Sequence, residues 1–227
     1  MNSNILKTPG VAILLALGIA GIVFVESTRA AWAPFFYIGA LLTVAIPFAA
    51  HTAFGDAERA KGMSLGFAMA LALIGLLIFD VLAMGPVFDA VGTDVGITPI
   101  SAALSALLAK AAISQHMSVD SASAIYAVFY VIWAPFAEEL FYRGYLRQSL
   151  RPRIGEGGTA VISSALFALR HVPHLMFLSS VPWMTVAMWA ASVFVSGLIL
   201  YWLVRRTGLL WPAIAVHFAG NVAGMLM

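Results

Sequence analysis

The chain has 227 residues, of which 62% are apolar, and its charged residues are only 12 Lys and Arg and 10 Asp and Glu. Soluble domains carry about a quarter charged residues, so this composition excludes an ordinary soluble domain. A formal net charge of +2 from so few groups does not indicate a nucleic-acid partner. Because the chain contains no cysteine, disulfides, thiolate catalysis and Cys-ligated metals are excluded as well.

Uncharged apolar stretches follow one another along the chain and predict an all-α, polytopic bundle of transmembrane helices. Seven candidate spans lie at about 8–25, 30–50, 63–79, 121–137, 157–169, 175–204 and 207–227. These spans use most of the chain. We therefore expect one membrane-embedded domain over residues 1–227, surrounded by the lipid bilayer and without a second, soluble domain.

Residues 100–118 are ambiguous, because Lys110 and His116 interrupt an Ala and Leu pattern with helical spacing. This pattern is typical of an amphipathic helix lying on the membrane, although an eighth span is the alternative. The positive-inside rule favours seven spans with a cytoplasmic N-terminus. In that topology the positive residues predicted on the cytoplasmic side are Lys7, Arg59, Lys61, Arg147, Arg151, Arg153, Arg205 and Arg206. The expected location is the inner cell membrane.

Ionisable residues within apolar spans are costly and mark function by default. Glu138 and Glu139 begin the richest such segment, and Arg143 lies four residues after Glu139, where it can neutralise that carboxylate. Glu138 is turned about 100° away and remains available for chemistry. His171 follows on a second predicted helix.

His217 and Asn221 share one face of a third predicted helix, because they are four residues apart. From the helical rise we expect Glu138, His171 and His217 at nearly the same depth in the membrane. A buried Glu beside a His can take a proton from water, and a His with an Asn one turn away offers two donors to an oxyanion. The residues therefore predict hydrolysis of an amide bond without a Ser or Cys nucleophile.

At these residues the sequence resembles the CAAX protease and bacteriocin-processing enzyme (CPBP) family, intramembrane endopeptidases that include the type II CAAX prenyl endopeptidases. The resemblance covers about residues 121–227 and rests on three segments in order: Glu138 to Arg143, Phe167 to His171, and His217 to Asn221.

The resemblance implies that Glu138 and His171 activate water, that His217 and Asn221 stabilise the oxyanion, and that Glu139 and Arg143 support the site. It also implies a membrane-associated protein or peptide as substrate. We favour a mechanism without a cofactor.

Three alternatives remain at the level of the sequence. In the first, the protein is a zinc-dependent intramembrane protease with Glu138, His171 and His217 as ligands, since these supply three N or O ligands. In the second, it is a small ion or proton-coupled transporter, since intramembrane Glu, Arg and His also form relays. In the third, it is a membrane binding or immunity protein without catalysis.

Overall fold

The computed structural model describes residues 3–28, 36–54, 64–79, 132–173 and 183–226, and every regular element within these ranges is a helix. The elements are α1 (Ser3–Leu6), α2 (Pro9–Thr28), α3 (Phe36–Ala49), α4 (Leu65–Phe79), α8 (Ala134–Glu138), the π-helix η4 (Glu139–Tyr145), α9 (Leu146–His171), α11 (Trp183–Thr207) and α12 (Trp211–Leu226). The all-helical class predicted from the sequence is therefore found throughout the described part of the chain.

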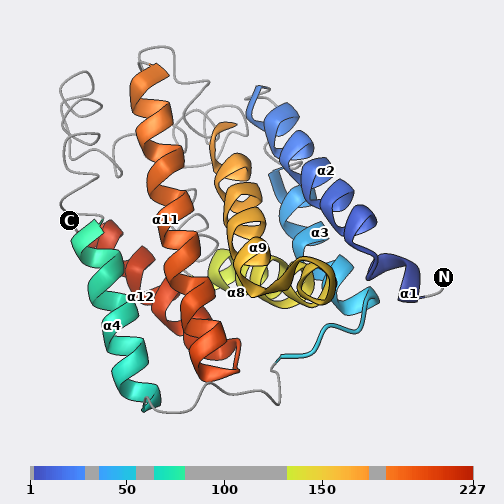
Figure 1. Cartoon of the computed structure of the whole chain (residues 1–227). Coiled ribbons are helices and arrows are strands. Elements are labelled where there is room, and N and C mark those ends of the chain that lie inside the picture. The colour runs from blue at the N-terminus through green and yellow to red at the C-terminus, as the bar shows by residue number, and fades with distance from the viewer. Residues whose placement is uncertain (1–2, 29–35, 55–63, 80–131, 174–182, 227) are drawn as a thin grey trace.

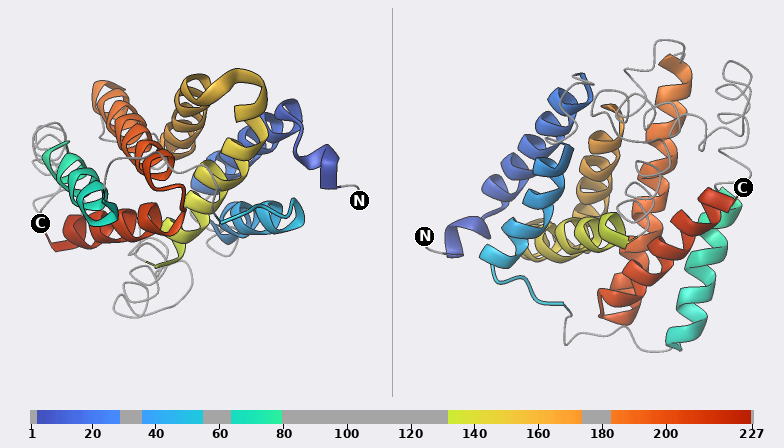
Figure 2. Two further views of the ribbon diagram at one scale, coloured as in Figure 1. Left: turned by 60° about the horizontal axis from the view of Figure 1, so that its bottom comes forward. Right: turned by 180° about the vertical axis from the view of Figure 1, so that it is seen from behind.

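The helices lie in two directions. The helices α2, α4, α11 and the second half of α9 run lengthwise, whereas the segment from α8 through η4 into the first half of α9 runs across this direction (Figure 1). The view from behind shows this crossing segment from the side, near the lower end of α3 and partway along α11 (Figure 2). The second half of α9 lies between α2 and α11 and contacts both of them.

Gly155 produces the change of direction within α9. Its backbone has φ 69° and ψ 176°, whereas the residues on both sides are helical. A positive φ is accessible to glycine at little cost because glycine has no Cβ. Thr159 Oγ1 donates to the Gly155 carbonyl oxygen at 2.7 Å and so satisfies a backbone group that the kink removes from the helix.

The central part of the crossing segment is buried. From Glu138 to Arg147 every side chain is less than a tenth exposed, including the charged ones. Phe141, Tyr142 and Tyr145 belong to a core cluster shared with α2 and α9, whereas Leu140 belongs to a second cluster shared with α4, α11 and α12. The segment therefore passes through the centre of the molecule, between its two apolar cores.

Neither seven nor eight membrane spans are confirmed. Among the described residues one helix, Val186–Thr207, is long and apolar enough to cross a membrane. Three further helices are apolar but shorter: Pro9–Val25, Ile38–Ala49 and Leu65–Leu77. A helix of 14 residues such as α3 rises only about 21 Å, less than the thickness of a hydrocarbon core.

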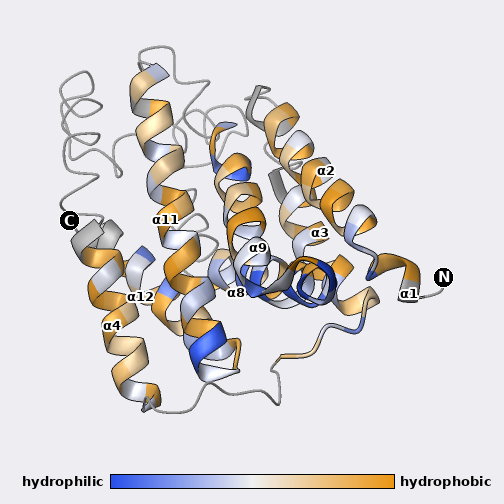
Figure 3. Cartoon of the chain, viewed as in Figure 1, coloured by the Kyte–Doolittle hydropathy of each residue, from blue (hydrophilic) through white to orange (hydrophobic). Residues whose placement is uncertain are grey.

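Hydrophilic residues are unevenly distributed over the fold. The helices α2 and α4 are predominantly apolar along their length, whereas hydrophilic residues gather on α9 and at the lower end of α11 (Figure 3). The ambiguous segment 100–118 and most of the predicted span 121–137 lie outside the described residues. The predicted span 157–169 corresponds to the second half of α9, which follows the kink at Gly155.

Candidate active site

The π-helix η4 carries two of the predicted site residues, Glu139 and Arg143. The backbone N–H of Leu146 donates to the Phe141 carbonyl oxygen, five residues earlier, which is the π-helical pattern. Ser163 Oγ on α9 donates to the Tyr142 carbonyl oxygen at 2.7 Å and fixes this turn against α9. Short π-helical turns are often found at functional sites, because they change the direction of the side chains that follow.

Glu139 lies between an arginine and a histidine. Arg143 Nη1 donates to Glu139 Oε1 at 2.9 Å, and both side chains are 0% exposed. This pair is the one predicted from the spacing of four residues. His217 Nδ1 lies 3.0 Å from the same oxygen, which neither the spacing nor the motif predicted. A carboxylate accepts hydrogen bonds, so Nδ1 of His217 carries the proton and Nε2 is directed elsewhere.

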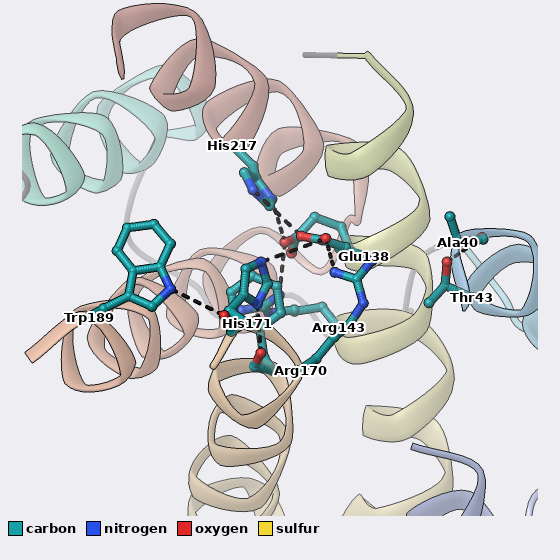
Figure 4. Close-up of polar contacts among 10 residues, drawn as sticks. Ala40, Thr43, Glu138, Arg143, Arg170, His171, Trp189 and His217 are labelled. Atoms are coloured by element: carbon teal, nitrogen blue, oxygen red, sulfur yellow. Dashed lines mark hydrogen bonds and ion pairs between the residues drawn. The ribbon is translucent and has the colours of Figure 1, made fainter. Parts of the chain in front are cut away.

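Glu138 lies where three helices meet. His171 Nε2 on α9 is 3.8 Å from Glu138 Oε1, and His217 Nε2 on α12 is 3.9 Å from Glu138 Oε2 (Figure 4). His171 Nδ1 donates to the Phe167 carbonyl oxygen at 2.8 Å, so Nε2 is the ring nitrogen that faces the carboxylate. Both imidazoles thus present Nε2 to one carboxylate group, on different oxygens.

Five of the six predicted side chains meet at this point: Glu138, Glu139, Arg143, His171 and His217. Side chains from the three predicted helical segments lie close together in the structure. The sixth residue, Asn221, lies one turn after His217 on α12 and is partly exposed.

Arg170 was not among the predicted site residues. The sequence left Glu138 without a partner, yet Arg170 Nη1 forms an ion pair with Glu138 Oε1, and both side chains are less than a tenth exposed. The sequence contains one signal for this contact, which is an arginine within an apolar span. Such an arginine requires an opposite charge, and Glu138 was the motif carboxylate without a predicted partner once Arg143 had been paired with Glu139.

The Phe167 ring contacts three polar side chains of the site. Its ring lies edge-on to His171 at 4.5 Å and to His217 at 6.1 Å between centroids. The Arg143 guanidinium carbon is 4.2 Å from the centroid of the same ring, which is a cation–π distance. The first residue of the second motif therefore supports three of the polar side chains, a role that the sequence analysis did not assign.

A second polar cluster lies at the Gly155 kink. Arg147 Nη2 is 2.7 Å from Glu156 Oε1, Arg151 Nη1 is 3.5 Å from the same oxygen, and Tyr201 Oη on α11 donates to Glu156 Oε2 at 2.5 Å. The Arg147 side chain is 5% exposed. Arg147 was predicted in the cytoplasmic charge cluster, and in the structure its side chain is buried within the protein.

Charge and hydrogen bonding hold Glu156 in its ionised form. Partial burial by itself would raise the pKa of this carboxyl group, but hydrogen bonds from Arg147 and Tyr201 and the nearby arginine charges lower it below its ordinary value of 4.5. The cluster thereby links the two halves of α9 to α11.

The carboxylates of the site are already compensated by positive side chains. Arg170 occupies Oε1 of Glu138, and Arg143 occupies Oε1 of Glu139. A cation held by Glu138, His171 and His217 would have to displace or face Arg170. Within the described residues no group of three or more His, Asp or Glu side chains is arranged to hold a metal ion.

Comparison with known proteins finds one match. The family model described as "Type II CAAX prenyl endopeptidase Rce1-like" matches residues 120–223, which include every residue of the site. The match agrees with the family to which the three motifs pointed, and this family indicates a membrane protease. Searches of the curated proteins and of the solved structures found no match.

Proposed function

Because residues 120–223 match the family model described as "Type II CAAX prenyl endopeptidase Rce1-like", we propose that the protein is an intramembrane endopeptidase whose catalytic residues are Glu138, His171, His217 and Asn221. Its substrate is a membrane-associated protein or peptide. The protein acts from the inner cell membrane with its N-terminus in the cytoplasm.

The proposal assigns water activation to Glu138 and His171. A water molecule beside the Glu138 carboxylate and His171 Nε2 gives up a proton as its oxygen attacks the carbonyl carbon of the scissile bond. The tetrahedral intermediate then collapses, the C–N bond breaks, and the proton passes to the leaving amine. One water is consumed, and a new carboxylate and a new amine are formed.

His217 and Asn221 are proposed to stabilise the negative charge on the carbonyl oxygen. In its protonated form His217 donates from both ring nitrogens, from Nδ1 to Glu139 and from Nε2 toward the reacting group. Glu139 and Arg143 act through His217, because they fix the orientation of its ring and compensate its charge. This arrangement corresponds to the orienting carboxylate of a catalytic triad.

One observation carries the proposal. The Nε2 atoms of His171 and His217 lie 3.8 Å and 3.9 Å from the two oxygens of a single buried carboxylate. The other nitrogen of each ring is engaged by a partner behind it, the Phe167 carbonyl group or Glu139. Side chains held in this way are preorganised, which is the property that a catalytic group requires.

The test is cleavage of a membrane-associated peptide by the purified protein in vesicles. We expect Glu138→Ala and His171→Ala each to reduce cleavage by at least about 100-fold, because each removes a group that transfers protons. Arg153→Gln, at an exposed position outside the site, is the control and should cleave as well as wild type. Cleavage by both site variants at the wild-type rate would contradict the proposal.

Metal dependence is tested in the same assay. We propose a metal-free, glutamate-type reaction, because guanidinium groups already compensate the carboxylates. Activity should therefore survive treatment with a chelator. Loss of activity on chelation, with recovery on addition of zinc, would favour the metal-dependent alternative over the one proposed here.

A further inference from the structure

Arg170 has a contact that no part of the proposed reaction explains. It is adjacent in sequence to His171, on α9, but its guanidinium reaches Glu138 on α8, 32 residues earlier in the chain. Figure 4 shows the Arg170, His171 and His217 side chains directed toward Glu138. The contact is to Oε1, the oxygen nearer to His171, whereas Oε2 is the oxygen nearer to His217.

The ion pair of Arg170 with Glu138 is buried. The side chains of Arg170 and Glu138 are 9% and 5% exposed, so little water is available to solvate either charge. Removing one member of a buried ion pair leaves the other charge uncompensated, which is costly. The described charged groups facing Glu138 are Arg170 and, when protonated, the two histidines. Arg170 is the permanent cation among them.

The two adjacent carboxylates of the motif therefore have separate arginines. Arg143 serves Glu139 from one turn along the same helix, whereas Arg170 serves Glu138 from a different helix. Only the second pair can set the relative position of the helices that carry Glu138 and His171. Its geometry determines which oxygen of Glu138 is occupied and which remains for the reacting water.

We propose that Arg170 is a positioning residue for the reaction: it binds Oε1 of Glu138 and orients the carboxylate so that Oε2 faces the reacting water. This inference rests on the proposed function. Arg170 does not contact the substrate in this proposal. Its effect is therefore expected on the rate of the chemical step and not on substrate binding.

The experiment compares Arg170→Lys and Arg170→Gln with wild type and with the exposed control Arg153→Gln in the vesicle assay. Loss of an orienting partner behind a reacting side chain typically reduces activity about 10- to 100-fold. We expect a loss of this size in kcat for Arg170→Gln, with KM changed less than about twofold, and a smaller loss for Arg170→Lys, which retains a positive charge. Unchanged kcat in Arg170→Gln, a loss confined to KM, or equal losses in the Lys and Gln variants would overturn the proposal.

A stability measurement separates this inference from the proposed function. In a double-mutant cycle, Arg170→Gln should lower the Tm of the wild-type protein much more than it lowers the Tm of Glu138→Gln. The reason is that Glu138→Gln has no negative charge at position 138 with which Arg170 could pair. Equal Tm losses in the two backgrounds would overturn the positioning contact. If wild type cleaves no peptide but the cycle shows coupling, the proposed function fails while the contact stands.

Discussion

At the scale of single residues, the spacing of the motif predicts contacts within one helix but not contacts between helices. The Glu139 and Arg143 pair followed from two residues four positions apart, and the structure has it at 2.9 Å. The pairs of Arg170 with Glu138 and of His217 with Glu139 join residues 32 and 78 positions apart. These contacts depend on how the helices pack, which a periodic pattern does not determine.

Gly197 shows how closely the helices approach behind the site. A Cβ at this position of α11 would lie 2.9 Å from Ser164 Cβ and 3.1 Å from Arg143 Nη2. The Ser164 Cβ atom is fixed by the backbone of α9, so it cannot move away without moving the helix. The missing side chain of Gly197 therefore allows α11 to pack against both α9 and the Arg143 guanidinium.

We predict that Gly197→Ala destabilises the protein by about 1–3 kcal/mol, the usual cost of overpacking. The displaced Arg143 should also weaken the orientation of Glu139 and so reduce peptide cleavage. Gly18→Ala is the matched control, because a Cβ there meets nothing within 4 Å. Thermal unfolding in detergent measures both variants. A Tm for Gly197→Ala equal to or above that of Gly18→Ala would refute the close packing.

At the scale of elements, hydropathy located apolar helices but not the crossing segment. The sequence predicted a span ending near residue 137 and placed Arg147 to Arg153 on the cytoplasmic side. In the structure a helical path runs from Ala134 to Ile154, is interrupted by the non-helical Gly155, and resumes as far as His171. Charged residues at 138–147 become buried because partners on the same path or on other helices compensate them. A search for uncharged stretches cannot detect such a helix.

The Gly155 kink gives a prediction for this element. An Ala at φ 69° is strained, and such conformations cost about 1–3 kcal/mol for a residue with a Cβ. Gly155→Ala should therefore lower the Tm, whereas Gly157→Ala, two residues later in the helix and without a positive φ, should leave it unchanged or raise it. Equal Tm values for the two variants would contradict the backbone conformation described here.

The Glu156 cluster gives a prediction for pH. The folded state lowers the pKa of Glu156 below the ordinary value of 4.5, so the folded state favours the ionised form. Its contribution to stability is complete above pH 4.5 and is lost as the pH falls through the lower pKa of the folded state. Glu156→Gln removes this contribution. The difference in Tm between wild type and Glu156→Gln should be largest near pH 7 and should shrink below pH 4.5, and a difference that stays constant down to pH 3 would contradict it.

At the scale of the whole molecule, composition predicted a membrane protein, and the family match agrees with that class. The number of spans is a different matter. Apolar length in the sequence counts residues, whereas a span requires one straight helix of sufficient rise, and α3 and α4 have only 14 and 15 residues. Most of the predicted cytoplasmic positive residues lie next to the start of α2, the kink in α9 and the end of α11. These three places lie toward the same end of the molecule (Figure 1).

Single-cysteine labelling tests the orientation, since the native chain contains no cysteine. We expect Arg153→Cys and Arg205→Cys, both at exposed positions, to react with an impermeant thiol reagent added from the cytoplasmic side. Trp183→Cys, at the other end of the 25-residue α11 and 75% exposed, should react from the opposite side. Labelling of Arg153→Cys and Arg205→Cys from different sides of the membrane would contradict the predicted topology.

The central claim is that the Glu138 carboxylate, set between two imidazoles, hydrolyses a peptide bond. The most direct measurement is the single-turnover rate of peptide cleavage in vesicles for Glu138→Gln, which keeps the shape of the side chain but removes its basicity. Glu156→Gln, the same chemical change outside the site, is the control at neutral pH. We predict that Glu138→Gln, folded as judged by its Tm, cleaves at least about 100-fold more slowly than Glu156→Gln. Equal rates for these two variants would contradict the account.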